Sequence, residues 1–300
     1  MATLWNDQKK VAAIVFVIFC TLLFSVELFA GLSSLLGAVL LGLLLHKRWI
    51  NFLVLLAGYM AVITYFEIAG MATLYPVMFV LVTYLIFAMF KNIEKGELFF
   101  WVNLSLSLLF ILAMFYLERK SGFVTQTING AKEEIKVMST VLKEVITEKE
   151  FSEFTAFALQ LLERYHIFFA LLQIVVFTAL NFLLLPLIFE NLPDAFNQPF
   201  YKLSIPYYGI WGLNVGLIVY LFQTGKVAIY GINAVLFFLA IYFFQGLSLS
   251  SAFFKKYGVP FYVSLIFFTL FLVNQAMWLL VSIAGIVDSQ FNIKKFLKEA

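Results

Sequence analysis

The sequence predicts an all-α fold, a polytopic transmembrane helical bundle of about 8–9 spans with an amphipathic helical insert. Hydrophobic residues make up 63% of the 300 residues, whereas charged residues make up only 12%. The mean hydropathy is +0.99. These values lie far outside the range of soluble globular domains. The apolar residues also form runs long enough to cross a bilayer, which requires about 20 helical residues.

One long stretch, residues 118–165, is polar. It holds seven Lys/Arg and eight Asp/Glu, and the other 252 residues hold 13 and nine. Five apolar segments precede this stretch and four follow it. The chain is therefore expected to have an N-terminal membrane half (1–117), a membrane-surface insert (118–165) and a C-terminal membrane half (166–300).

The insert carries helical periodicity. Its apolar stripe consists of Ile135, Met138, Leu142 and Val145. Thr147 and Glu150 then have the spacing of a capping box, and a second apolar stripe leads toward the next span. Two interpretations stay open: a helical hairpin lying on the membrane, and two helices packed on each other without lipid contact.

The first apolar run, Val11–Leu45, is too long for one span and short for two. We expect it to break between Glu27 and Ser34, which leaves Leu35–Leu45 as a short or re-entrant helix. Lys9 and Lys10 precede the run as in a signal peptide, but a retained first span is the better interpretation.

The remaining apolar runs each have about the length of one span. They are Trp49–Ile68, Thr73–Phe90, Leu98–Leu117, His166–Ile188, Pro206–Gln223, Val227–Ser250 and Val259–Val287. Pro76, Pro206 and Pro260 are expected in first helical turns, where a missing N–H costs nothing. The Lys/Arg rule makes the short loops around Lys47 and Lys95 cytoplasmic, and the basic tail then violates the rule.

Several functional classes lack support in the sequence. A net charge of +3 is too small to suggest nucleic-acid binding. The single cysteine, Cys20, excludes a disulfide framework, and neither His46 nor His166 has neighbours for a metal site. No phosphate loop, nucleophile elbow or zinc-ligand pair is present. We therefore expect no enzyme activity, no cofactor and no metal.

Polar residues inside the apolar runs are the candidate binding residues, because such side chains face a bundle interior rather than lipid. For the amides, the simpler interpretation is a hydrogen bond between two helices. For the two acids, Glu27 and Asp288, it is a position at the membrane boundary, and for Asp288 a position in water at a helix end is favoured over burial. The candidates are Asn181, Asn214, Gln245, Asn274, Gln275, Glu27 and Asp288.

The second half resembles the YybS-like family of uncharacterised bacterial membrane proteins. The resemblance rests on Leu203-Ser-Ile-Pro-Tyr-Tyr-Gly-Ile-Trp211, on Tyr242-Phe-Phe-Gln-Gly246, and on Gly285-Ile-Val-Asp288 followed by Phe291 and Lys294-Lys295. The sequence departs from the family at Lys294, where an Arg is expected. The family has no established activity, and it is distantly similar to the substrate-binding components of energy-coupling-factor transporters and to the cell-shape protein MreD.

This resemblance implies a multi-pass protein of the bacterial inner (plasma) membrane with one of two functions. The first is binding, and help in transporting, a small polar solute, with the candidate amides converging on one cavity and a separate ATPase as partner. The second is a non-transporting scaffold that recruits envelope or cell-division proteins. The lipid bilayer is the expected partner in both cases.

Overall fold

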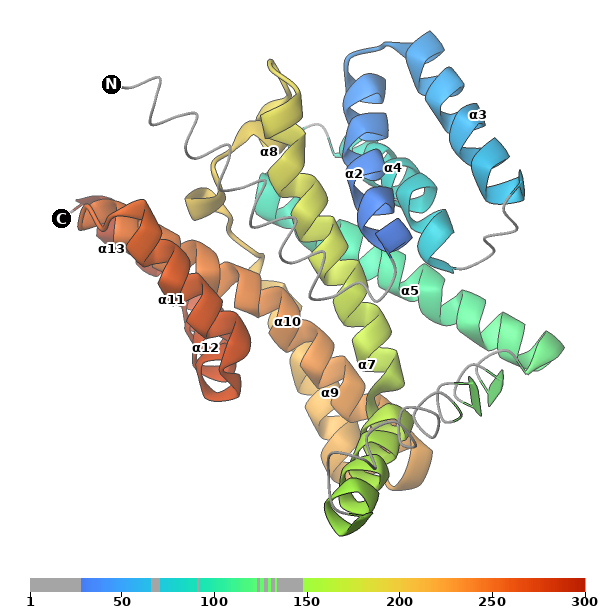
Figure 1. The fold of residues 1–300 in the computed structure, drawn as a ribbon. Helices are drawn as coiled ribbons and strands as arrows, with labels where there is room; N and C mark the ends of the chain where they lie inside the picture. The colour runs from blue at the N-terminus through green and yellow to red at the C-terminus, as the bar shows by residue number, and fades with distance from the viewer. Residues whose placement is uncertain are drawn as a thin grey trace. The chain divides into compact units, whose positions relative to one another are not determined.

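The computed structural model describes residues 28–65, 71–90, 92–122, 125–126, 129–130, 133 and 148–299. Every regular element in this part of the chain is helical, which confirms the all-α prediction (Figure 1). Several predictions lie outside the described residues. These are the first span from Val11, the surroundings of Cys20 and Glu27, and the insert stripe from Ile135 to Val145.

The described helices follow one another in chain order. They are α2 (Leu28–Leu45), α3 (Trp49–Tyr65), α4 (Met71–Met89), α5 (Lys95–Ser121), α7 (Glu148–Ile188), α8 (Asp194–Asn197), η1 (Phe200–Lys202), η2 (Tyr207–Gly209), α9 (Ile210–Phe222), α10 (Gly225–Lys256), α11 (Phe261–Val273), α12 (Gln275–Phe291) and α13 (Ile293–Glu299).

Three of the described helices are long and apolar enough to cross a membrane: Lys95–Lys120, Arg164–Ile188 and Gly225–Lys256. The bent pair α11 and α12 makes a fourth if it counts as one span, and four shorter apolar helices accompany them. The expected 8–9 spans are not confirmed by these lengths. Many helices of 10–17 residues fall short of the roughly 20 that a straight crossing needs.

α7 runs without a break from Glu148 to Ile188, and the candidate span within it, Arg164–Ile188, begins close to the predicted start at His166. Two sequence predictions about the other helices were wrong. The expected span Val259–Val287 breaks at Asn274, where the axes of α11 and α12 differ in direction by 102°. Pro76 lies inside α4 rather than in its first turn, because α4 begins at Met71.

The chain divides into two compact units that are each discontinuous in sequence. The first unit contains residues 1–106, 173–211 and 238–300, and the second contains residues 107–172 and 212–237. These units differ from the predicted parts, which are two membrane halves separated by an insert. That division stays a prediction.

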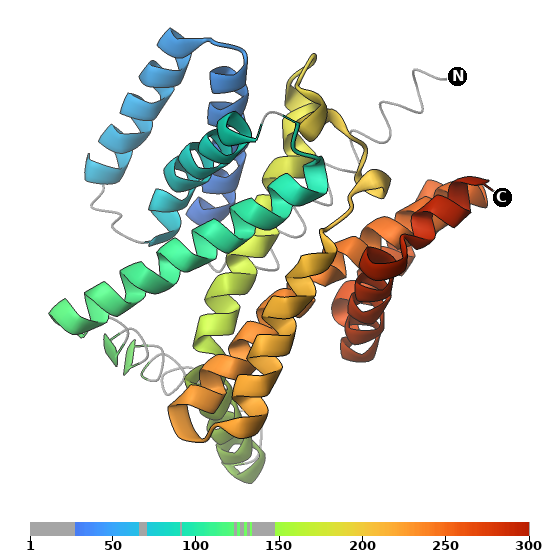
Figure 2. The ribbon, with the colours of Figure 1, turned by 180° about the vertical axis from the view of Figure 1, so that it is seen from behind.

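In the first unit, α2 packs along both α3 and α4, as the views from two sides show (Figures 1 and 2). Leu40 and Phe79 are fully buried in this part of the core. The Tyr75 hydroxyl lies 3.1 Å from the Thr178 hydroxyl, which ties α4 to α7. Aromatic packing continues from Phe79 to Phe182.

Two glycines let α10 and α12 approach within the first unit. A Cβ on Gly246 would lie 1.9 Å from the Val281 carbonyl oxygen, and a Cβ on Gly285 would lie 2.0 Å from that of Tyr242. Side chains at these positions would hold the two backbones apart, so glycine permits the contact. The same approach brings Gln245 of α10 near Asp288 of α12.

Candidate functional site

The segments that carry the family resemblance meet in the first unit. They supply the C-terminal polar cluster, which we define as Gln245, Ser248, Asp288 and Lys294. All four side chains are buried, with Gln245 and Ser248 at 0% exposure. α10 contributes Gln245 and Ser248, α12 contributes Asp288, and α13 contributes Lys294.

Asp288 and Lys294 form the charged centre of this cluster. Lys294 Nζ lies 3.1 Å from Asp288 Oδ2, and the Lys294 backbone N–H donates to Oδ1 at 3.1 Å. The Gln245 side-chain amide donates to Oδ2 as well. Lys294 Nζ also donates to the Leu203 carbonyl and, at 2.9 Å, to the Ser248 hydroxyl. The ammonium group thus has an acceptor for each of its three N–H bonds.

A left-handed residue between the two helices produces this ion pair. Asn292, with φ 50° and ψ 51°, ends α12, and its N–H donates to the Asp288 carbonyl at 2.8 Å. Asparagine tolerates this conformation better than most residues. The chain turns there, and both the backbone N–H and the ammonium group of Lys294 reach Asp288. The interpretation of Asp288 as a residue in water was therefore wrong, because its side chain is buried.

The cluster also fastens the segment between α8 and η2. The Ile205 N–H donates to Gln245 Oε1 at 2.8 Å, and the Ser248 hydroxyl donates to the Phe200 carbonyl at 2.7 Å. The described contacts use both ends of the Gln245 amide. A cluster whose groups are bonded in this way stabilises the fold and leaves few groups to bind a solute.

Asn181, in α7, makes its hydrogen bond outside this cluster and donates to the carbonyl of Phe177 in its own helix at 2.8 Å. Among the described residues its Oδ1 has no hydrogen-bond partner, and it faces Gly37, where a Cβ would lie 2.9 Å away. Asn214 is half-buried in α9, and Glu27 lies outside the described residues.

Asn274 caps a helix. Its Oδ1 accepts hydrogen bonds from the N–H groups of Ala276, at 3.0 Å, and Met277, at 3.2 Å. This is the usual bonding of an asparagine N-cap. Asn274 was expected inside the helical span Val259–Val287, and this was wrong, because Asn274 is extended and precedes α12. Gln275 is the first residue of α12, and its side chain lies outside the description.

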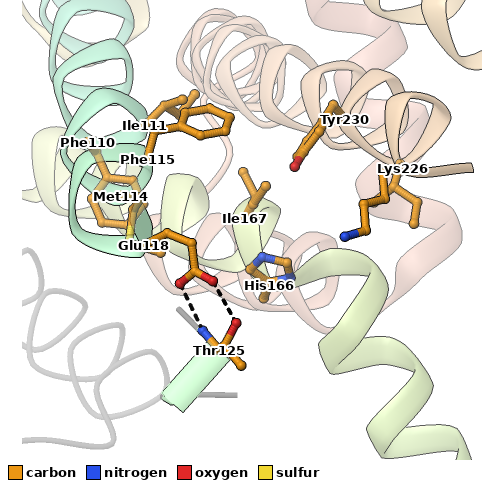
Figure 3. Close-up of a pocket in the computed structure, with 11 residues that line it drawn as sticks. Phe110, Ile111, Met114, Phe115, Glu118, Thr125, His166, Ile167, Lys226 and Tyr230 are labelled. Atoms are coloured by element: carbon orange, nitrogen blue, oxygen red, sulfur yellow. Dashed lines mark hydrogen bonds between the residues drawn. The ribbon is translucent and has the colours of Figure 1, made fainter. Parts of the chain in front are cut away.

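A pocket of about 350 Å³ lies within the second unit. Its walls are mainly apolar, and its polar side chains include those of Glu118, His166 and Lys226 (Figure 3). The lining residues are Phe110, Ile111, Met114, Phe115, Glu118, Thr125, His166, Ile167, Lys226, Ile229 and Tyr230. The combination of apolar walls with a few polar groups is typical of ligand sites.

The polar groups of the pocket lie on different helices. Glu118 of α5 accepts hydrogen bonds from Thr125, with the hydroxyl at 2.6 Å and the backbone N–H at 3.2 Å. Lys226 of α10 and His166 of α7 point into the space on the other side of Ile167 (Figure 3). Each of the three lies within a few residues of the end of a candidate span. The pocket therefore combines apolar span surface with charged span ends.

Asn233 of α10 holds the α7 turn that lines this pocket. Its Oδ1 accepts from the Phe168 N–H at 2.7 Å, and its Nδ2 donates to the Arg164 carbonyl at 2.9 Å. In a regular α-helix the Phe168 N–H would donate to the Arg164 carbonyl. Here the Asn233 amide bonds both groups and so bridges this turn of α7. His166 lies inside that turn. Asn233 thus ties the pocket wall to α10.

A second pocket, of about 530 Å³, lies between α2 and α3 in the first unit. Leu36, Asn51, Val54, Leu55, Gly58 and Tyr59 line it. Leu36 belongs to the Leu35–Leu45 segment that the sequence predicted to be a short or re-entrant helix. None of the predicted amides lines either of these two pockets. Gln245 and Asp288 are the two predicted residues that the described contacts bring together.

Comparison with known proteins identifies the family. The predicted membrane protein family DUF2232 matches residues 66–289. The chain belongs to this family. Together with its long apolar helices, this membership makes the chain an integral membrane protein. No curated protein and no solved structure matches it.

The matched range contains Gln245, Asp288 and every residue of the second-unit pocket. Sequence reasoning missed that pocket, because His166 and Lys226 were judged by their sequence neighbours alone. One signal was present: Glu118, His166 and Lys226 each stand near the boundary of an apolar run. Charges at such boundaries lie at one of two membrane surfaces, but the sequence alone does not tell which ones meet.

Proposed function

We propose that this integral membrane protein binds a small amphiphilic molecule in the second-unit pocket. The observation that carries the proposal is the pairing of apolar walls with charged groups from span ends in one cavity of about 350 Å³. An amphiphile places its chain against apolar surface and its head group in the polar boundary region. This proposal keeps the solute-binding function expected from the sequence, with an amphiphile in place of a purely polar solute.

A purely polar solute held by the interior amides is the less favoured form. Gln245 bonds Asp288 and Ile205, and Asn181 bonds its own helix. A ligand at either amide would have to replace these protein contacts. Leaving their partners unpaired costs free energy, about 1–3 kcal/mol for each buried group.

A scaffold without a ligand is the second candidate function. The C-terminal polar cluster favours it, because a buried ion pair with satisfied donors holds α10, α12 and α13 in one arrangement. Recruitment of envelope or cell-division proteins by the insert and loops is part of this candidate. Coupling to a separate ATPase belongs to the solute-binding candidate if it extends to transport.

The binding proposal is tested by filling the pocket. Ile111→Trp enlarges a lining side chain of α5, and we expect at least tenfold weaker retention of amphiphile, which is about 1.4 kcal/mol. The matched control is Leu112→Trp, because Leu112 neighbours Ile111, is 56% exposed and is not among the lining residues. Native mass spectrometry of the purified protein, titrated with phosphatidylglycerol, measures the bound fraction.

Retention by Ile111→Trp equal to that of Leu112→Trp would contradict pocket binding and favour the scaffold. Both variants must first show the wild-type melting temperature, so that a folding defect is not read as lost binding. If Ile111→Trp is unstable, Ile229→Trp tests the same pocket from α10.

A further inference from the structure

The polar residues at one end of the second-unit pocket indicate which head group its ligand has. We propose that the ligand is an anionic bilayer lipid whose phosphate group is bound by Lys226 and His166. This inference rests on the proposed function, because it specifies which amphiphile the pocket takes. Phosphatidylglycerol represents the class.

Lys226 supplies the main attraction for an anion. It lies at the start of α10, where the first turn contains no acidic residue. The side chain is exposed and lines the pocket, and its ammonium group points toward the space beside His166 (Figure 3). A lysine at a membrane boundary attracts anionic lipid, and basic pockets between spans bind such head groups.

His166 adds a hydrogen-bond donor on the opposite wall. The Asn233 amide bridges residues 164 and 168 of α7, and His166 lies within that turn. The turn is therefore attached to the same helix that carries Lys226. Two donors fixed on neighbouring helices suit the several acceptor oxygens of one phosphate group.

Glu118 is the acidic group on the pocket wall, and its hydrogen bonds favour an anionic lipid over a zwitterionic one. Its carboxylate accepts both the Thr125 hydroxyl, at 2.6 Å, and the Thr125 backbone N–H, at 3.2 Å. Figure 3 shows both hydrogen bonds between Glu118 and Thr125. Because they already occupy the Glu118 carboxylate, it is less available to the cationic group of a zwitterionic lipid.

The apolar walls distinguish a lipid from a free anion. Phe110, Ile111, Met114 and Ile229 present hydrocarbon to the cavity, and inorganic phosphate would gain nothing from it. The volume of about 350 Å³ lies near the lower end of the range for ligand pockets, about 300–1,000 Å³. It suits the part of one chain next to the head group, with the rest of the lipid in the bilayer.

The experiment compares the binding of two lipid head groups to the wild type and to lysine variants. Delipidated protein in dodecyl maltoside is titrated with phosphatidylglycerol or phosphatidylcholine of identical chains, and native mass spectrometry gives the two dissociation constants. We expect the wild type to prefer phosphatidylglycerol by about tenfold. Lys226→Met should reduce this preference to less than twofold, whereas Lys226→Arg should retain most of it. Lys256→Met, at the other end of α10, is the matched control and should leave it unchanged.

Further outcomes separate the alternatives. Equal binding of the two lipids, both lost in Ile111→Trp, would leave amphiphile binding intact and overturn the anionic head group. Lipid binding that Ile111→Trp does not change would overturn the proposed function itself. Competition by millimolar inorganic phosphate would point to a free anion instead of a lipid. Weaker phosphatidylcholine binding in Glu118→Gln would assign a zwitterionic ligand, so it too would contradict the proposal.

Discussion

Replacing Gly246 by leucine is expected to destabilise the protein by about 3 kcal/mol or more, because overpacking at a backbone contact cannot relax through side chains. The first added carbon would lie 1.9 Å from the Val281 carbonyl oxygen, so α10 and α12 must separate. Gln245 and Asp288 lie beside this contact, and their hydrogen bond would lengthen as well. Scanning fluorimetry in detergent measures the fall in melting temperature, about 2–4 °C for each kcal/mol in a chain of this size.

Gly58→Leu is the matched control for this substitution. Gly58 lies in α3, and among the described residues no atom beyond its own stretch of helix backbone lies within 4 Å of its added Cβ. Leucine there should be neutral or stabilising, since leucine favours helix more than glycine does. Equal melting temperatures for the Gly246 and Gly58 variants would show that α10 and α12 do not approach in this way.

Removing the cation of the C-terminal polar cluster is expected to cost about 3–5 kcal/mol, the range measured when one partner of a buried ion pair is deleted. In Lys294→Met the buried Asp288 carboxylate, 3% exposed, loses its ammonium partner. The Ser248 hydroxyl and the Leu203 carbonyl lose a donor at the same time. Thermal or chemical unfolding in detergent measures the loss.

Two further variants make this result specific. Lys295→Met changes an exposed neighbour and should have little effect on the free energy of unfolding. The double variant Asp288→Asn with Lys294→Met removes both charges, and it should be more stable than Lys294→Met alone. A double variant as unstable as the sum of its single variants would mean that the two residues do not interact.

The sequence predicted the helical membrane class well, because hydropathy and run length report directly on the bilayer as solvent. It also singled out Gln245 as an interior polar residue and Asp288 as a candidate binding residue, although it favoured a position in water for Asp288. It did not predict that they bond each other. That contact depends on the turn at Asn292 and on the glycine approach of α10 to α12, and neither leaves a periodic signal.

The error at Asn274 has a different cause. An asparagine within an apolar run was taken for an intramembrane amide, but its side chain replaces the N–H partners that a new helix lacks at its start. Hydropathy does not distinguish these roles. The second-unit pocket was missed for a related reason, because side-by-side placement of Glu118, His166 and Lys226 is a property of packing rather than of spacing.

The most direct test of amphiphile binding is an experimental structure of the protein in nanodiscs that contain phosphatidylglycerol. Our account predicts density for an acyl chain against Ile111, Phe115 and Ile229, with head-group density within hydrogen-bonding distance of Lys226. A second-unit pocket closed by its own side chains, with lipid density confined to the outer surface of the helices, would contradict it.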